Sequence, residues 1–256
     1  MPATPRCSTS TMTPGTSLYR LFAWLSPAFP TGAFSYSHGL EAEAAAGTVH
    51  DRATLQAWIA AMLRHGGGRL DADLLRDAHR AAASGDAAAG AAVTRRGCAY
   101  RATAELALES VAQGEAFAAT VDAAWRDPHP PIAGAMGPTL SRGAGEGAEG
   151  RSPEAGEGVC HAVAVGAAAA QAGASLDDAL LLYLQAFAAN LMSAGLRLGI
   201  VGQTDGQRIL AALEPVVGAA AAASLARDPE DFGAAAFAAD LAAMAHETQY
   251  TRLFRS

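Results

Sequence analysis

Residues 35–39 hold the side chains best suited to chemistry, in the order Ser-Tyr-Ser-His-Gly. Their spacing is close to that of the nucleophile elbow Gly-x-Ser-x-Gly, in which Ser37 would be the nucleophile of a serine hydrolase. That motif needs a preceding strand, and a glycine in its first position to allow the sharp turn. Here Ser35 takes the place of the glycine, and a turn containing Pro27 and Pro30 precedes it. The pattern therefore favours a protein that is not an enzyme, with a hydrolase using Ser37 as the alternative.

Metal ligands at a suitable spacing do not occur in the sequence either. His246-Glu247 begins like the zinc motif His-Glu-x-x-His, but Tyr250 stands where the second histidine would be. Cys160 and His161 are adjacent, so on a helix their side chains would point about 100° apart. We therefore predict no catalytic residue, no cofactor and no metal site.

Two stretches combine aromatic and charged side chains in a way that is typical of docking surfaces. In residues 26–41, two prolines and Gly32 fix a turn that orients the following side chains at low entropic cost. Near the end of the chain, aromatic and aliphatic residues stand beside arginines, as they do in interface anchors. The predicted partner-binding residues are Phe34, Tyr36, His38 and Glu41 in the first stretch, and Tyr250, Arg252, Leu253, Phe254 and Arg255 in the second.

Apolar residues recur at helical spacing along most of the chain, and no stretch alternates cleanly with a period of two. We predict an all-α protein, a single globular domain of about ten packed helices over residues 17–256. Residues 1–16 are rich in Ser, Thr and Pro, which predicts a disordered tail. Residues 127–158 are dominated by Pro, Gly, Ser and Glu, which predicts a long flexible loop within the domain.

Two further predictions each concern a single helical stretch. Gly114 is expected to mark a kink or a split in a long helical stretch over residues 87–125. Residues 70–83 form a helix whose apolar side faces inward and whose charged side faces solvent. Its inward residues are Leu74, Leu75 and Ala78, and its outward residues are Asp71, Asp73, Arg76 and Arg80.

Residues 176–202 are long and apolar enough to raise the question of a membrane span, and the helix predicted over residues 176–198 is apolar on more than one face. Polar residues interrupt the run, including Asp177, Gln185 and Asn190, so we predict a buried core helix and no membrane contact. In the next helix, residues 207–226, Pro215 implies a break.

Charge and cysteine content limit the classes of function. The chain has 18 Lys and Arg against 25 Asp and Glu, a net charge of −7, and no basic patch. Binding of nucleic acid is not expected, because phosphates are neutralised by clustered basic side chains. The three cysteines are widely spaced and suggest no disulfide framework, which favours a cytoplasmic location.

Three blocks of residues together resemble the urease accessory protein UreF family. The first is Ser26-Pro-Ala-Phe-Pro-Thr-Gly-Ala-Phe-Ser-Tyr-Ser-His-Gly-Leu-Glu41, in which Thr31 stands where the family usually has Val or Ile. The second is Gly202-Gln-Thr-Asp-Gly-Gln207, and the third is His246-Glu-Thr-Gln-Tyr-Thr-Arg-Leu-Phe-Arg-Ser256. They occur in the family's order and span about residues 17–256.

The resemblance implies an all-α, non-catalytic protein that is needed for nickel insertion into urease. Such proteins dimerise, bind the accessory protein UreD (also called UreH), recruit the GTPase UreG and present it to the urease apoprotein (UreABC). The family's C-terminal segment is ordered at the UreD interface. With nickel as the cargo, a further alternative is a protein that binds nickel directly through His38, His50 or Cys160.

Overall fold

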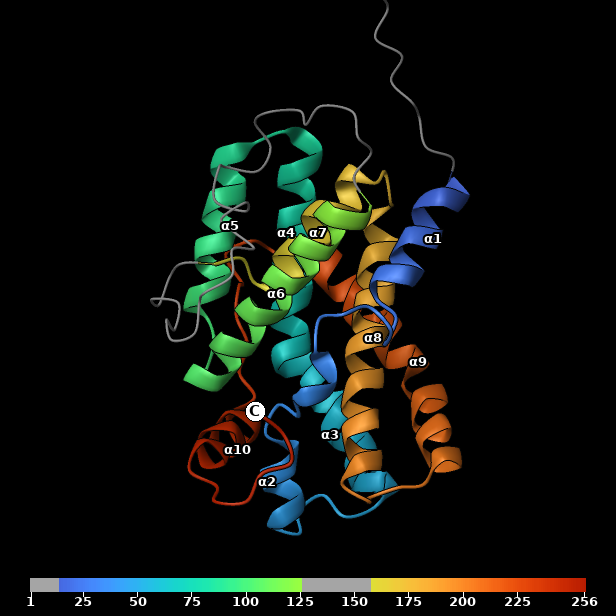
Figure 1. The fold of residues 1–256 in the computed structure, drawn as a ribbon, viewed down its shortest axis with the longest axis vertical. Coiled ribbons are helices and arrows are strands. Elements are labelled where there is room, and N and C mark those ends of the chain that lie inside the picture. Colours follow the sequence, from blue (N-terminus) through green and yellow to red (C-terminus); the bar gives the residue numbers. More distant parts are fainter. Residues whose placement is uncertain (1–13, 126–157) are drawn as a thin grey trace, which may run out of the picture.

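The computed structural model describes residues 14–125 and 158–256, and within these ranges every regular element is a helix (Figure 1). The all-α prediction is therefore confirmed. The helices are α1 (Pro14–Trp24), a 3-10 helix η1 (Ala33–Ser35), α2 (Leu40–Ala45), α3 (Arg52–His65), α4 (Gly67–Ser84), α5 (Ala87–Ala99), α6 (Ala104–Ala124), α7 (His161–Gln171), α8 (Leu176–Arg197), α9 (Gln203–Ala226) and α10 (Phe237–Glu247).

The two segments predicted to lack structure fall mostly outside the described residues. The predicted tail, residues 1–16, is described only from residue 14, and residues 14–16 form the first turn of α1, so the prediction is wrong for them. Pro14 suits this place because proline is tolerated in the first turn of a helix. The predicted loop, residues 127–158, lies outside the described residues except for Gly158.

The bundle is centred on α4, α7 and α8, which share one hydrophobic core. Small residues on α7 let its backbone approach α4 closely. A Cβ added at Gly166 would lie only 2.4 Å from the carbonyl oxygen of Leu75 on α4. On α8, Leu180, Leu184 and Leu191 are fully buried. By length and composition α8 and α9 could each span a membrane, but α8 is a core helix here, as predicted.

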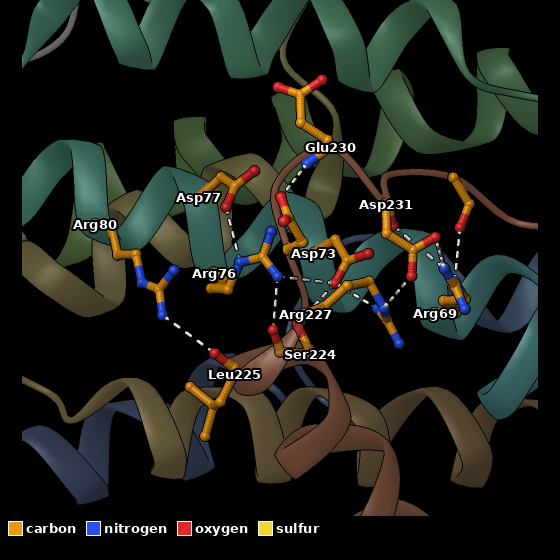
Figure 2. A network of polar contacts seen from close by, with 12 residues as sticks. Arg69, Asp73, Arg76, Asp77, Arg80, Ser224, Leu225, Arg227, Glu230 and Asp231 are labelled. Carbon is orange, nitrogen blue, oxygen red and sulfur yellow. Dashed lines mark hydrogen bonds and ion pairs between the residues drawn. The ribbon is translucent and has the colours of Figure 1, made fainter.

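Of the four charged residues of α4 that were predicted to face solvent, Asp71, Asp73 and Arg76 are buried, so the prediction is wrong for these three. Arg80 is exposed, as predicted. Core helices cover one side of α4, and the end of α9 together with the segment that follows covers the other. Figure 2 shows the network of polar contacts that forms on that second side. Asp73 accepts hydrogen bonds from Arg227 (2.6 Å) and from the Ser224 hydroxyl (2.9 Å).

Arg76 completes this network and fixes the end of α9. Its guanidinium donates to the Ser224 carbonyl (2.6 Å), one of the last carbonyls of α9, and contacts Asp73 at 3.3 Å (Figure 2). Cations near helix C-termini are favoured by the free carbonyls and the helix dipole. Arg69 holds the following segment through Asp231 (3.0 Å). The network therefore joins α4 to the chain beyond α9.

α9 continues through Pro215, so the predicted break is wrong. Proline lacks the N–H that would bond the Ala211 carbonyl, but both residues are exposed and water can replace that bond.

Gly114 lies inside the continuous helix α6, so the helix is not split at this residue. The split occurs earlier, between α5 and α6, where the Thr103 hydroxyl caps α6 by accepting from the Leu106 amide (3.2 Å). The glycine serves packing instead. A Cβ at position 114 would lie 2.0 Å from the Val159 carbonyl oxygen, where the chain enters α7.

We expect Gly114→Ala to lower the free energy of unfolding by about 1–3 kcal/mol, because the added methyl group must push α6 away from α7. Gly218→Ala is the matched control, since nothing lies within 4 Å of a Cβ added there in α9. It should be neutral or stabilising by about 0.5–1 kcal/mol. Urea unfolding monitored by circular dichroism measures both. Equal stabilities of the two variants would contradict the close crossing.

Candidate functional site

The proline-rich turn between α1 and α2, which we call the elbow (residues 26–39), positions the start of α2. Gly32, with φ of 74°, begins η1, and the turn ends with two left-handed residues, His38 (φ 53°) and Gly39 (φ 79°). A side chain at Gly39 would collide with α10, since its Cβ would lie 2.8 Å from the Ala243 amide nitrogen. α2 therefore lies against α10 at one end of the bundle (Figure 1).

The last residues of the chain, which we call the strap (residues 249–256), run back along the elbow. The Ser37 amide and hydroxyl both donate to the Ser256 carbonyl oxygen, at 2.7 and 2.6 Å. The Arg255 amide donates to the Ser35 carbonyl at 2.8 Å. The two stretches singled out by their composition thus lie side by side, although more than two hundred residues separate Ser37 from Ser256.

Glu41, at the start of α2, is the main hydrogen-bond acceptor for the backbone of the strap. The residue is only 7% exposed, and its carboxylate accepts from the backbone amides of Leu253 (2.6 Å) and Phe254 (2.9 Å). The same carboxylate contacts His246 Nε2 at 3.1 Å. Charged acceptors make stronger hydrogen bonds than neutral ones, so Glu41 fixes the strap backbone firmly.

His246, near the end of α10, joins Glu41 to a second carboxylate. Its ring is fully buried, and its Nδ1 lies 2.8 Å from Glu105 on α6. Glu105 in turn forms an ion pair with Arg252 of the strap. A carboxylate–histidine–carboxylate bridge therefore crosses beneath the strap and holds it from both sides.

Beyond Glu41 the strap is fixed by two further contacts. The Phe254 ring is buried under the guanidinium of Arg197, whose central carbon lies 4.3 Å from the ring centre. The Ser256 hydroxyl donates to Glu109 on α6 at 2.6 Å. Glu109 also contacts His38 Nε2 at 3.1 Å. Burial lowers the pKa of His38, but the charge and hydrogen bond of Glu109 outweigh that effect and leave the pKa raised.

The predicted binding residues thus divide into two groups. The first group takes part in the contacts between the strap, the elbow and α6: His38, Glu41 and Phe254, with Arg252 through its ion pair to Glu105. Tyr36 is buried within the elbow. Those whose side chains are directed to solvent are Phe34, Tyr250, Leu253 and Arg255. Among the apolar ones Phe34 is 66% exposed, Leu253 is 61% exposed and Tyr250 is fully exposed.

A cavity of about 850 Å³ lies between the elbow and α4, α6 and α8. Its polar wall includes an ion pair between Asp71 and Arg101, with N–O separation of 2.8 Å, and Tyr183 donates its hydroxyl to Asp71 at 2.9 Å. Burial lowers the pKa of Arg101, but Asp71 outweighs it and leaves the pKa raised. Burial lowers the pKa of His161 to about 4, so this ring is neutral at pH 7.

Composition and motif patterns missed these cavity residues and also Glu105, Glu109 and the bridging role of His246. One signal was present for Asp71. It precedes Leu74 by three, Leu75 by four and Ala78 by seven positions, which places it on the inward face of α4. A charged residue on an apolar face indicates a buried partner, although the sequence does not show that the partner is Arg101.

The structure also shows the surroundings of the residues that a serine hydrolase or a nickel-binding protein would use. The Ser37 hydroxyl is fully buried and is occupied by its bond to Ser256. Within residues 14–125 and 158–256, no three His, Cys, Asp or Glu side chains are grouped so as to hold a metal ion. His38 is engaged by Glu109, and burial raises the pKa of the Cys160 thiol.

The chain is similar in sequence to known proteins along most of its length. The family model described as UreF matches residues 49–214. A urease accessory protein UreF of Rhodopseudomonas palustris (strain BisB18) is 47% identical over 240 residues, covering 94% of this chain and 92% of the relative. The protein of the same name from Granulibacter bethesdensis is 45% identical over 240 residues, with 94% of each chain covered.

The chain therefore belongs to the UreF family of urease accessory proteins. The match to the family model covers neither the elbow nor the strap, both of which lie outside residues 49–214.

We expect Asp71→Asn to lower the free energy of unfolding by about 3–5 kcal/mol, because it leaves the Arg101 charge buried without a partner. Replacing both groups, Asp71→Asn with Arg101→Met, should restore part of that loss. Denaturant unfolding of the single and double variants measures the difference. If the double variant were as unstable as the sum of its two single changes, the ion pair would not be the reason for the loss.

Proposed function

We propose that this protein is a scaffold in nickel insertion, acting as a chaperone of urease maturation rather than as an enzyme. In this proposal it binds UreD (UreH), recruits the GTPase UreG and presents it to the urease apoprotein. It acts in the cytoplasm as a homodimer within that complex, and needs no cofactor of its own. Membership of the UreF family supports the proposal, since the relatives carry the name urease accessory protein.

The observation that carries the proposal is the exposed side chains on a fixed backbone. The strap is held by hydrogen bonds to Glu41, Ser35 and Ser37, yet it presents Tyr250 and Leu253 to solvent. The preceding helix α10 also carries exposed apolar side chains: Phe237, Leu241 and Met244. Aromatic and aliphatic side chains of this kind supply most binding energy in protein interfaces. A fixed backbone avoids the ordering cost of binding.

We expect Tyr250→Ala combined with Leu253→Ala to weaken the binding of UreD at least about tenfold, since central interface residues each contribute more than 1 kcal/mol. Leu181→Ala is the matched control, because Leu181 is an exposed leucine near the start of α8. It should bind as the unchanged protein does. Surface plasmon resonance with immobilised UreD measures both, and thermal unfolding checks that both variants are folded.

If the double variant, Tyr250→Ala with Leu253→Ala, binds UreD as tightly as the unchanged protein, the strap is not part of the UreD surface. Size-exclusion chromatography with light scattering, with and without UreD, tests the homodimer separately.

The hydrolase alternative predicts a different result for Ser37→Ala. A hydrolase would lose turnover with its fold intact, whereas a scaffold loses one hydrogen bond to Ser256 and only loosens the strap. Ester hydrolysis and UreD binding, measured on the same sample, separate these outcomes. Equilibrium dialysis against nickel decides the second alternative, direct binding through His38, His50 or Cys160. Stoichiometric binding that disappears with Cys160→Ser would favour it over the scaffold.

A further inference from the structure

The bridge beneath the strap has a geometry that fixes its protonation. His246 Nδ1 lies 2.8 Å from a Glu105 oxygen, and Nε2 lies 3.1 Å from a Glu41 oxygen. Both are hydrogen-bond distances to acceptor groups. A neutral imidazole carries hydrogen on only one nitrogen, so its other lone pair would face a carboxylate. Both contacts are favourable only when the bridge holds one more proton, as in imidazolium.

The charges around the ring lead to the same conclusion. The groups that face it are Glu41 from α2 and Glu105 from α6, with Arg252 of the strap on Glu105. On its own helix, Glu247 accepts from the Glu105 amide at 3.2 Å. With a neutral ring, Arg252 is the only cation within residues 14–125 and 158–256 that forms an ion pair with Glu41 or Glu105. A protonated ring balances their charge in a site where His246 itself has no exposure to water.

The strap depends on the same two carboxylates. Glu41 accepts the amides of Leu253 and Phe254, and Glu105 holds Arg252. If the ring loses its proton, one carboxylate faces a lone pair and must move away. Movement of Glu41 releases the strap backbone, and movement of Glu105 releases Arg252. Either movement weakens the docking of the strap.

We propose that the proton on His246 locks the strap onto the elbow, so that pH regulates the assembly of the partner-binding surface. The docked strap holds a proton that the released strap does not need. Docking is therefore strongest at lower pH and is lost as the pH rises through the titration of the ring, for as long as the carboxylates remain charged. Its biological meaning rests on the proposed function, but the switch belongs to the isolated protein.

The test is NMR on the full ¹⁵N-labelled chain without any partner, raising the pH stepwise from about 6 to about 9. The ring nitrogens of His246 report its protonation, and exchange protection of the Leu253 and Phe254 amides, corrected for the intrinsic rate, reports docking. We expect a doubly protonated ring at the low end. Amide protection should fall at least about tenfold as the ring loses its proton.

Glu105→Gln separates a switch from a merely structural contact. The glutamine oxygen can still accept from Arg252, while its amide can donate to the lone pair of a neutral ring. Strap protection in this variant should therefore persist at high pH, where the unchanged protein loses it. His50→Gln replaces an exposed histidine outside the bridge and should leave the pH profile unaltered.

Three results would overturn the proposal. They are a neutral His246 ring at about pH 6 with the strap docked, amide protection that is unchanged across the whole pH range, and a Glu105→Gln variant that loses protection equally at all pH values. Because no partner is present, none of these results bears on the UreD proposal. Failure of UreD binding would likewise leave the switch intact.

Discussion

The buried carboxylate of Glu41 is the constraint on which the candidate site depends. A carboxylate taken out of water must recover its hydrogen bonds within the protein, or it destabilises the fold. Here the donors come from the strap backbone and from His246. Because α2, α10 and the strap each supply a part, none of the three can take its place without the others. The exposed face of the strap is a consequence of this arrangement.

A similar requirement shapes the interior around α4. Two of its aspartates are buried on different sides of the helix, Asp71 toward Arg101 and the cavity, and Asp73 toward Arg227 and the end of α9. Each carboxylate brings a distant part of the chain to α4. These pairs contribute little net stability compared with apolar packing, but leaving either carboxylate without its partner is costly. They therefore specify which segments lie against the central helix.

The sequence was sufficient for the helical class and for most helix positions, because apolar spacing and caps are local features. It failed where a second segment determines the outcome. Asp73 and Arg76 looked solvent-facing because nothing local indicates that α9 covers them. Gly114 looked like a weak point, because a backbone crossing at Val159 cannot be recognised from spacing. Composition singled out the elbow and the strap, but that Glu41 receives the strap depends on tertiary contacts.

The proposed function requires that the elbow and the strap form one preassembled surface for UreD. Hydrogen–deuterium exchange of the protein, alone and in complex with UreD, tests it most directly. We expect residues 249–256 to be protected already in the free protein, and their protection and that of residues 33–41 to increase in the complex. A complex in which protection increases only elsewhere, with the strap and the elbow unchanged, would contradict it.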